Sequence, residues 1–357
     1  MSSIVRITLI LLSTLWPQAC AKENVRIEPP IVDKRVELIS LVFRLAEKQE
    51  YAEKEFKLYT DRIDRHFEEY KNHELIQFTR FIIKENDIAF DGPMWLAAHL
   101  DEDLKLLPEV KEVWQLDPRW TEENVHQFVL LLQQFREDSQ FDRFFKENKE
   151  LYAELARRFT PIYEQVDLDW YASFFGKKPT ETFAIRLGPG ILGNCFGVNV
   201  DYLNGERKVY AVMGMWMFDQ TGFPEFSTLP DLGILTHEFC HPFVDHLTEK
   251  HREAFRESGE KIYAALQESQ SAEAYTSWEV ILDEVLINAA VIQYMKDHDF
   301  EQSEIEAWIN LIKYSFGFYW VENLADALES YEQQRDKYPT LDSFMPELAK
   351  SYKAWTK

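Results

Sequence analysis

The chain has 357 residues, of which 46% are hydrophobic; this supplies enough apolar material for a large core and excludes a mainly disordered protein. It carries 39 basic against 62 acidic residues, a formal net charge of −23, and the acidic residues are spread along the chain. A surface of this sign repels phosphate, which excludes nucleic acid as the main partner.

Residues 1–19 have the layout of a secretory signal peptide, with Arg6 before an apolar run from Ile7 to Trp16. The run is shorter than the ~20 apolar residues of a spanning helix. Both an ordinary A-x-A cleavage site and a bacterial lipoprotein site, at which Cys20 is lipidated, are compatible with it. We favour the lipoprotein, because a lone cysteine before a polar segment is otherwise unexplained. We therefore expect export, either as an envelope lipoprotein (outer membrane or cell surface) or to the periplasm, with membrane contact only through Cys20.

Residues 20–35 are polar and contain Pro29-Pro30, so they predict a tether. Residues 36–165 predict a helical N-terminal region, because apolar side chains recur at helical spacing in stretches such as VELISLVFRLAEK and ENVHQFVLLLQQF.

The pattern changes in the remaining region, residues 166–357. ETFAIRL and NCFGVNVDY alternate apolar and polar side chains and predict strands. Asn204-Gly205 predicts a hairpin turn, and KVYAVMGMWMF supplies the returning strand. Helices follow to the C-terminus. The order predicts an α+β fold, predominantly helical with a small mixed sheet, rather than a doubly wound sheet.

The stretch THEFCHPFVDH places His237 and His241 four residues apart, on one side of a helix, with Glu238 directly after the first histidine. This is the H-E-x-x-H arrangement, in which two histidines bind zinc and the glutamate polarises a zinc-bound water. The apolar residues around the pair predict a buried helix, and buried histidines need a partner. We therefore predict a zinc ion at His237 and His241, with Glu238 as general base.

A catalytic zinc site needs a third protein ligand. His246 lies on the opposite side of the helix from His237, so we expect it to be an exposed helix-end histidine. In TSWEVILDEVL, Thr276 and Glu279 match a capping box, which gives Glu279 a structural role. Glu284 falls inside an apolar stripe, where a carboxylate needs a cation, so we favour Glu284 as ligand. Asp283 and Glu279 remain alternatives.

Two cysteines bear on the same region. Cys240 lies beside the histidines and would close the site as a fourth ligand, although we expect it to pack as a small core residue. A disulfide between Cys195 and Cys240 is left open.

With THEFCH followed by a helical carboxylate, the chain resembles the gluzincins, zinc metallopeptidases whose third ligand is a glutamate on a later helix. More closely, VDKRVELISLVFRLAE, LDWYASFFG, THEFCHPFVD and WEVILDEVLINAAV resemble a bacterial envelope family known only as a domain of unknown function (DUF4932), from about Val32 to about Met295. The resemblance implies a zincin-like fold in residues 166–357, with His237, His241 and Glu284 as ligands and Glu238 as base.

The resemblance also raises two questions about the groups around the metal. Gluzincins often carry a further carboxylate four residues after the ligand glutamate, and here that position is Asn288. Many also supply a tyrosine or histidine to the developing oxyanion. The tyrosines that could do so here are Tyr275, Tyr294, Tyr314 and Tyr319.

These observations predict a zinc metallohydrolase, most simply a peptidase acting on a peptide or protein substrate, to which the strand from Asn194 to Tyr202 offers an edge. The alternative is a non-catalytic envelope lipoprotein that binds a protein or glycan on a metal-stabilised zincin scaffold.

Overall fold

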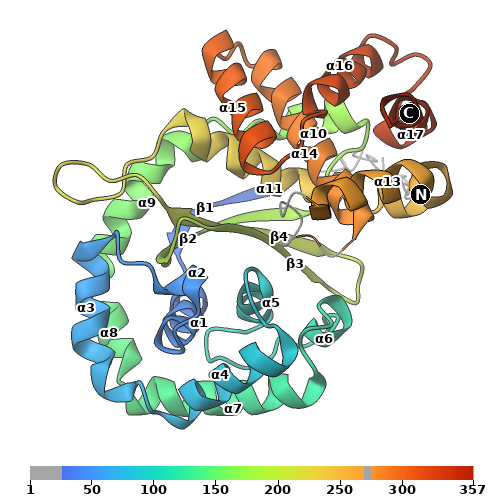
Figure 1. Ribbon diagram of the computed structural model, residues 1–357. Coiled ribbons are helices and arrows are strands. Elements are labelled where there is room, and N and C mark those ends of the chain that lie inside the picture. The colour runs from blue at the N-terminus through green and yellow to red at the C-terminus, as the bar shows by residue number, and fades with distance from the viewer. Residues whose placement is uncertain (1–25, 269–274, 276, 357) are drawn as a thin grey trace, which may run out of the picture.

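The computed structural model describes residues 26–268, 275 and 277–356 (Figure 1). The expected signal peptide, residues 1–19, and the lipidation site Cys20 lie outside these residues. Among the described helices, none is both long and apolar enough to cross a membrane.

A four-stranded sheet lies at the centre of the protein, between two groups of helices (Figure 1). Its strands stand in the order β1-β2-β4-β3, and β1, β2 and β4 are parallel whereas β3 runs antiparallel to β4. The sheet is therefore mixed, as the sequence predicts, and β3 forms one edge. The strand bounds are Arg26–Val32 for β1, Thr182–Leu192 for β2, Cys195–Asp201 for β3 and Arg207–Met215 for β4.

The predicted hairpin is confirmed. β3 and β4 pair from Cys195 opposite Met213 to Asp201 opposite Arg207. Gly205 in the connecting turn has φ +92°, a left-handed backbone conformation that glycine adopts without steric cost.

The predicted tether is wrong for residues 26–32, which form β1 and pair with β2. The register of this pair shifts between Glu28 and Ile31, at Pro29-Pro30. Proline cannot donate a ladder hydrogen bond, so an edge strand with an irregularity is the place in a sheet that tolerates it. Glu28 also forms ion pairs with Arg186 and Lys208, which a local reading of the sequence cannot supply.

The first group of helices precedes β2. Of these, α1, α2 and α5 pack against the sheet, and α9 runs along β1. The helices α3, α4, α6, α7 and α8 form an outer arc, whereas α10 lies on the other side of the sheet, with the helices that follow β4 (Figure 1). The bounds are α1 Lys34–Leu45, α2 Gln49–Ala52, α3 Lys57–Phe67, the 3-10 turn Glu68–Tyr70, α4 Glu74–Asn86, α5 Gly92–Ala98, α6 Val113–Leu116, α7 Glu122–Asp138, α8 Phe141–Glu147, α9 Lys149–Tyr163 and α10 Leu168–Phe175.

The second group follows β4 and covers the opposite face. There α11 contacts β3 and β4 on one side and α14 on the other (Figure 1). α14 is buried along nearly its whole length and also packs against α16. The bounds are the irregular turn Thr228–Leu232, α11 Gly233–Val244, α12 Leu247–Lys250, α13 Arg252–Glu268, α14 Trp278–Asp297, α15 Gln302–Ser315, α16 Val321–Glu332 and α17 Leu341–Trp355.

Glu37 joins α1 to the sheet and to two other helices. It is 2% exposed; its carboxylate accepts a hydrogen bond of 2.6 Å from the Tyr59 hydroxyl and one of 3.3 Å from the Gly190 backbone N–H. The Tyr59 hydroxyl also lies 2.7 Å from that of Tyr152. Burial raises the pKa of Glu37 to about 7, because the charged form loses its hydration.

Glu37→Gln should therefore flatten the pH dependence of stability. A carboxyl group whose folded pKa is raised contributes stability below its unfolded pKa and loses it as the pH rises through the folded value. Between pH 5 and pH 8 we expect the wild type to lose on the order of 2–3 kcal/mol more unfolding free energy than Glu37→Gln. Urea unfolding of metal-free protein measures this, with the exposed Glu69→Gln as control. Equal slopes in Glu37→Gln and the wild type would contradict the assignment.

Candidate metal centre

The contacts of α11 with the core determine the direction in which its two histidines point. Phe239 packs against Phe183 of β2 at a ring separation of 4.7 Å, and Phe243 stacks on Phe175 of α10 at 4.6 Å. These contacts fix the rotation of the helix. His237 and His241 consequently share the remaining face, with ring centroids 5.1 Å apart.

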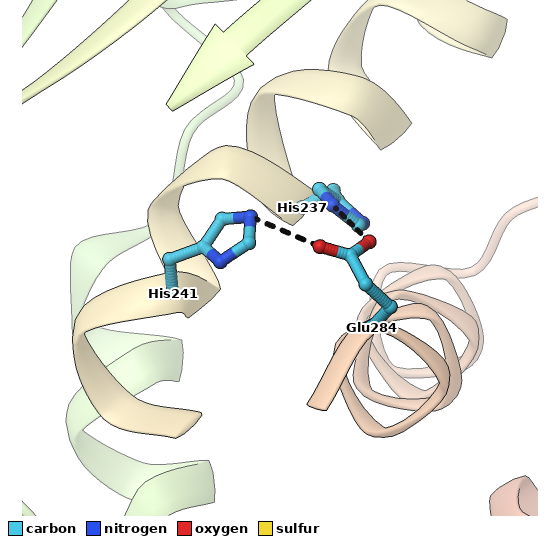
Figure 2. Close-up of side chains that lie close together, drawn as sticks. All are labelled: His237, His241 and Glu284. Carbon is cyan, nitrogen blue, oxygen red and sulfur yellow. Dashed lines mark ion pairs between the residues drawn. The ribbon is translucent and has the colours of Figure 1, made fainter. Parts of the chain in front are cut away.

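Glu284 on α14 lies between these two imidazoles (Figure 2). One carboxylate oxygen is 3.4 Å from Nε2 of His237, and the other is 4.0 Å from Nε2 of His241. Burial by itself would raise the pKa of Glu284, but the two histidines outweigh it and the pKa is lowered. The carboxylate is therefore held in its charged, metal-binding form.

The three residues fit a divalent metal ion. One donor atom from each lies within 4.8 Å of the others. Ligand bonds of ~2.0–2.1 Å in a tetrahedron separate donor atoms by roughly 3.4 Å. The distance from Nε2 of His237 to Glu284 equals this value, and that from Nε2 of His241 is wider, at 4.0 Å. Two imidazoles and one carboxylate are donors that divalent transition metals accept.

Asp245 orients His241 from behind. Its Oδ1 lies 2.9 Å from Nδ1 of His241, so Nδ1–H donates to the carboxylate and Nε2 is left to face Glu284. Burial alone would lower the pKa of His241, yet the carboxylates of Asp245, Glu284 and Glu238 raise it to about 10. The surroundings of His241 thus favour positive charge, which a metal ion also supplies.

Glu238 points to the edge strand and not into the ligand group. Its carboxylate is 3.8 Å from Nε2 of His241, and it is buried against Gly197 of β3. A Cβ at position 197 would come within 2.4 Å of its Oε2, so any larger residue there would displace the Glu238 carboxylate from this position. Burial raises the pKa of Glu238, which favours proton uptake.

The alternative ligands have other partners. The Thr248 hydroxyl donates to Asp283, and burial raises the pKa of Asp283 to about 8. Glu279 pairs with Arg252 at 2.7 Å. The predicted cap was wrong: Ser277 caps α14 by accepting from the Val280 backbone N–H, and Thr276 lies outside the described residues.

The remaining candidate groups are separated from the ligand group. His246 is exposed between α11 and α12, as expected. Cys240 is buried in the core, and Cys195 and Cys240 are both free, so neither a fourth sulfur ligand nor a disulfide is present.

A cleft of about 430 Å³ opens beside the ligand group. His237, Glu238 and Glu284 line one side of it, together with Tyr275 and Asn288. None of the other three tyrosines lines the cleft. The Tyr294 hydroxyl donates a hydrogen bond to the Gln165 carbonyl, and Tyr314 and Tyr319 are 71% and 62% exposed.

Sequence reasoning missed Asp245 and Gly197, which act on His241 and Glu238. The signal for Asp245 was its position four residues after His241, within THEFCHPFVD. Gly197 gave no local signal, because its neighbour belongs to another element.

Metal content tests the ligand set. By mass spectrometry we expect about one zinc ion per purified chain. His237→Ala and Glu284→Ala should each lose it, because two ligands hold zinc far more weakly than three. Asp283→Asn is the matched control: it removes the adjacent acid and should retain the metal. Zinc retained in Glu284→Ala, or lost in Asp283→Asn, would contradict the assignment.

Of the comparisons with known proteins, one finds a match. No curated protein and no solved structure matches the chain. A family model described as a domain of unknown function (DUF4932) matches residues 30–351, which include the helices before β2, the strands β2, β3 and β4, the end of β1 and all the site residues. The chain therefore belongs to the DUF4932 family.

Proposed function

We propose that this protein is a zinc metallopeptidase of zincin-like fold, in which His237, His241 and Glu284 hold the zinc and Glu238 is the general base. The observation that carries the proposal is the geometry of these four side chains. Three form an open ligand set, and the fourth is a buried carboxylate that stands beside the set without joining it.

A zinc ion bound there supplies a Lewis acid that polarises a carbonyl group and lowers the pKa of water to ~7. Glu238 accepts the proton that water gives up as it attacks the peptide carbonyl, and then donates it to the leaving amine. Its raised pKa suits both steps, because it must release the proton as well as take it up. His241 is held by Asp245 and keeps its orientation meanwhile.

The edge strand β3 offers a place for the substrate backbone. At its far end it is covered by residues 109–111, through the bond of 2.8 Å from the Lys111 N–H to the Asp201 carbonyl. Towards its start, Cys195 lines the cleft and Gly197 contacts Glu238. An extended peptide added along this part of β3 would place its carbonyl groups beside Glu238.

Export belongs to the same proposal. It rests on the signal-like residues 1–19 and on Cys20 as the lipid anchor, with the mature protein at the outer membrane, at the cell surface or in the periplasm. Replacing Cys20 with Ala should release the protein from the membrane fraction if the anchor exists. Unchanged fractionation would favour ordinary signal cleavage.

Glu238→Gln tests the base. The amide cannot accept the proton, so we expect kcat/KM for peptide hydrolysis to fall by roughly a hundredfold or more while zinc is retained. Peptide-library cleavage and metal content measure the two effects, and Glu249→Gln on α12 is the matched exposed control. Retained hydrolysis would remove Glu238 from this role. A zinc-loaded wild type that hydrolyses no peptide would instead favour the non-catalytic binding protein.

Tyr275 is the tyrosine that we assign to the developing oxyanion, because it lines the cleft together with Glu284. Tyr275→Phe should lower kcat by roughly a hundredfold, with little change in KM or zinc content. Steady-state kinetics measure this, and the exposed Tyr314→Phe should match the wild type. A loss confined to KM would show that Tyr275 binds substrate rather than stabilising charge.

A further inference from the structure

The cleft has two chemically different sides. The polar side holds the ligand group and Glu238. The opposite side is apolar and is built from the segment after β4, the start of α11 and the last turns of α15. Its lining side chains are Trp216, Ile234, Trp308, Leu311, Ile312 and Phe316.

The apolar side is preformed because Trp308 is locked against α11. Trp308 is 3% exposed, and its ring lies on Gly233, where a Cβ would approach the ring to 2.8 Å. Gly233 precedes His237 by one helical turn on the same helix. The position of this wall is therefore set relative to the proposed metal ligands.

Part of this apolar wall of the cleft is exposed to solvent. Leu311 and Phe316 both line the cleft, yet they are 39% and 41% exposed. Tyr314 and Tyr319 belong to the same stretch of chain but lie outside the cleft lining; they are more exposed still, and their rings lie 6.3 Å apart. Apolar side chains gathered at the mouth of a cleft indicate a surface that an apolar group covers.

Among the described residues that line the cleft, no charged group is free to bind a peptide terminus. Among the described residues that line it there is no lysine or arginine, so no cation faces a substrate C-terminal carboxylate. The carboxylates in this described part of the lining are those of Glu238 and Glu284, and the proposed mechanism already uses both.

We infer that the cleft binds a large apolar side chain next to the scissile bond, and that the cleaved bond is internal in its peptide. This inference rests on the proposed function. It makes the protein an endopeptidase that selects phenylalanine-like or leucine-like residues by burial, at the side of the site formed by α15.

Blocked peptides test the preference. The substrates are acetyl-Ala-Ala-Gly-Xaa-Ala-Ala-amide, with Phe, Leu, Gly or Lys at Xaa, and mass spectrometry identifies the cleaved bond. We expect cleavage next to Xaa, with kcat/KM for Phe and Leu roughly tenfold or more above that for Gly and Lys. Equal rates for all four, or cleavage only of peptides with a free terminus, would overturn the inference.

Leu311→Asp tests the wall itself. Leu311 is partly exposed, so the variant should fold. The ratio of kcat/KM for the Phe and Lys peptides should fall by roughly tenfold or more, because a carboxylate replaces apolar surface. Leu130→Asp on α7 is the matched control; Leu130 is 67% exposed and does not line the cleft, so it should leave the ratio unchanged. An unchanged ratio in Leu311→Asp would overturn the inference.

Binding separates failure of this inference from failure of the proposed function. Calorimetry with Glu238→Gln protein should show roughly tenfold tighter binding of the Phe peptide than of the Gly peptide, and the added Leu311→Asp change should abolish the difference. If this preference is found while the wild type hydrolyses nothing, the cleft is right and the enzyme assignment is wrong. Hydrolysis with no preference in rate or binding would mean that the enzyme assignment is right and the inference about the cleft is wrong.

Discussion

The crossing of α11 and α14 is the constraint on which the site depends. Glu284 lies in a helix that is buried along most of its length. A carboxylate in such a helix costs free energy unless positive charge faces it. The two imidazoles of α11 face it at 3.4 and 4.0 Å, and the pair together forms the ligand group. Neither helix contains a complete site alone.

The sheet holds α11 in place from the other side. Phe183 of β2 packs on Phe239, which sets the helix rotation, and β3 passes so close to Glu238 that a Cβ at position 197 would displace its carboxylate. One helix is thereby placed between a sheet edge and a second helix. His237 and His241 face α14, whereas the carboxylate of Glu238 faces β3.

The charge arrangement of the site is compact and one-sided. Asp245, Glu238 and Glu284 surround His241 and together favour a positive charge at this position. The cleft continues from this acidic group into an apolar wall fixed by the contact of Trp308 with Gly233. The acidic group and the apolar wall are thus neighbours in one cleft. The first is formed by α11 and α14, and the second is fixed by the contact between α11 and α15.

Much of this could be predicted from the sequence, where the signal is local. The hairpin at Asn204-Gly205, the helix of His237 and His241, and Glu284 within an apolar stripe all follow from spacing along one segment. Setting Asp283 aside as a ligand required the tertiary structure, because the Thr248 hydroxyl that donates to Asp283 comes from another helix. The cap at Ser277 in place of Thr276 shows that helix ends are less certain than helices.

The sequence by itself determined the secondary structure of most segments, the spacing of the histidine pair and the need of a buried carboxylate for a partner. Tertiary structure alone decided that residues 26–32 form a strand, that Gly197 makes room for Glu238, and that α15 walls the cleft. The reason is physical: periodicity and turn chemistry act between near neighbours in the chain. Strand pairing, close packing and the satisfaction of buried charge act between segments that only the folded chain brings together.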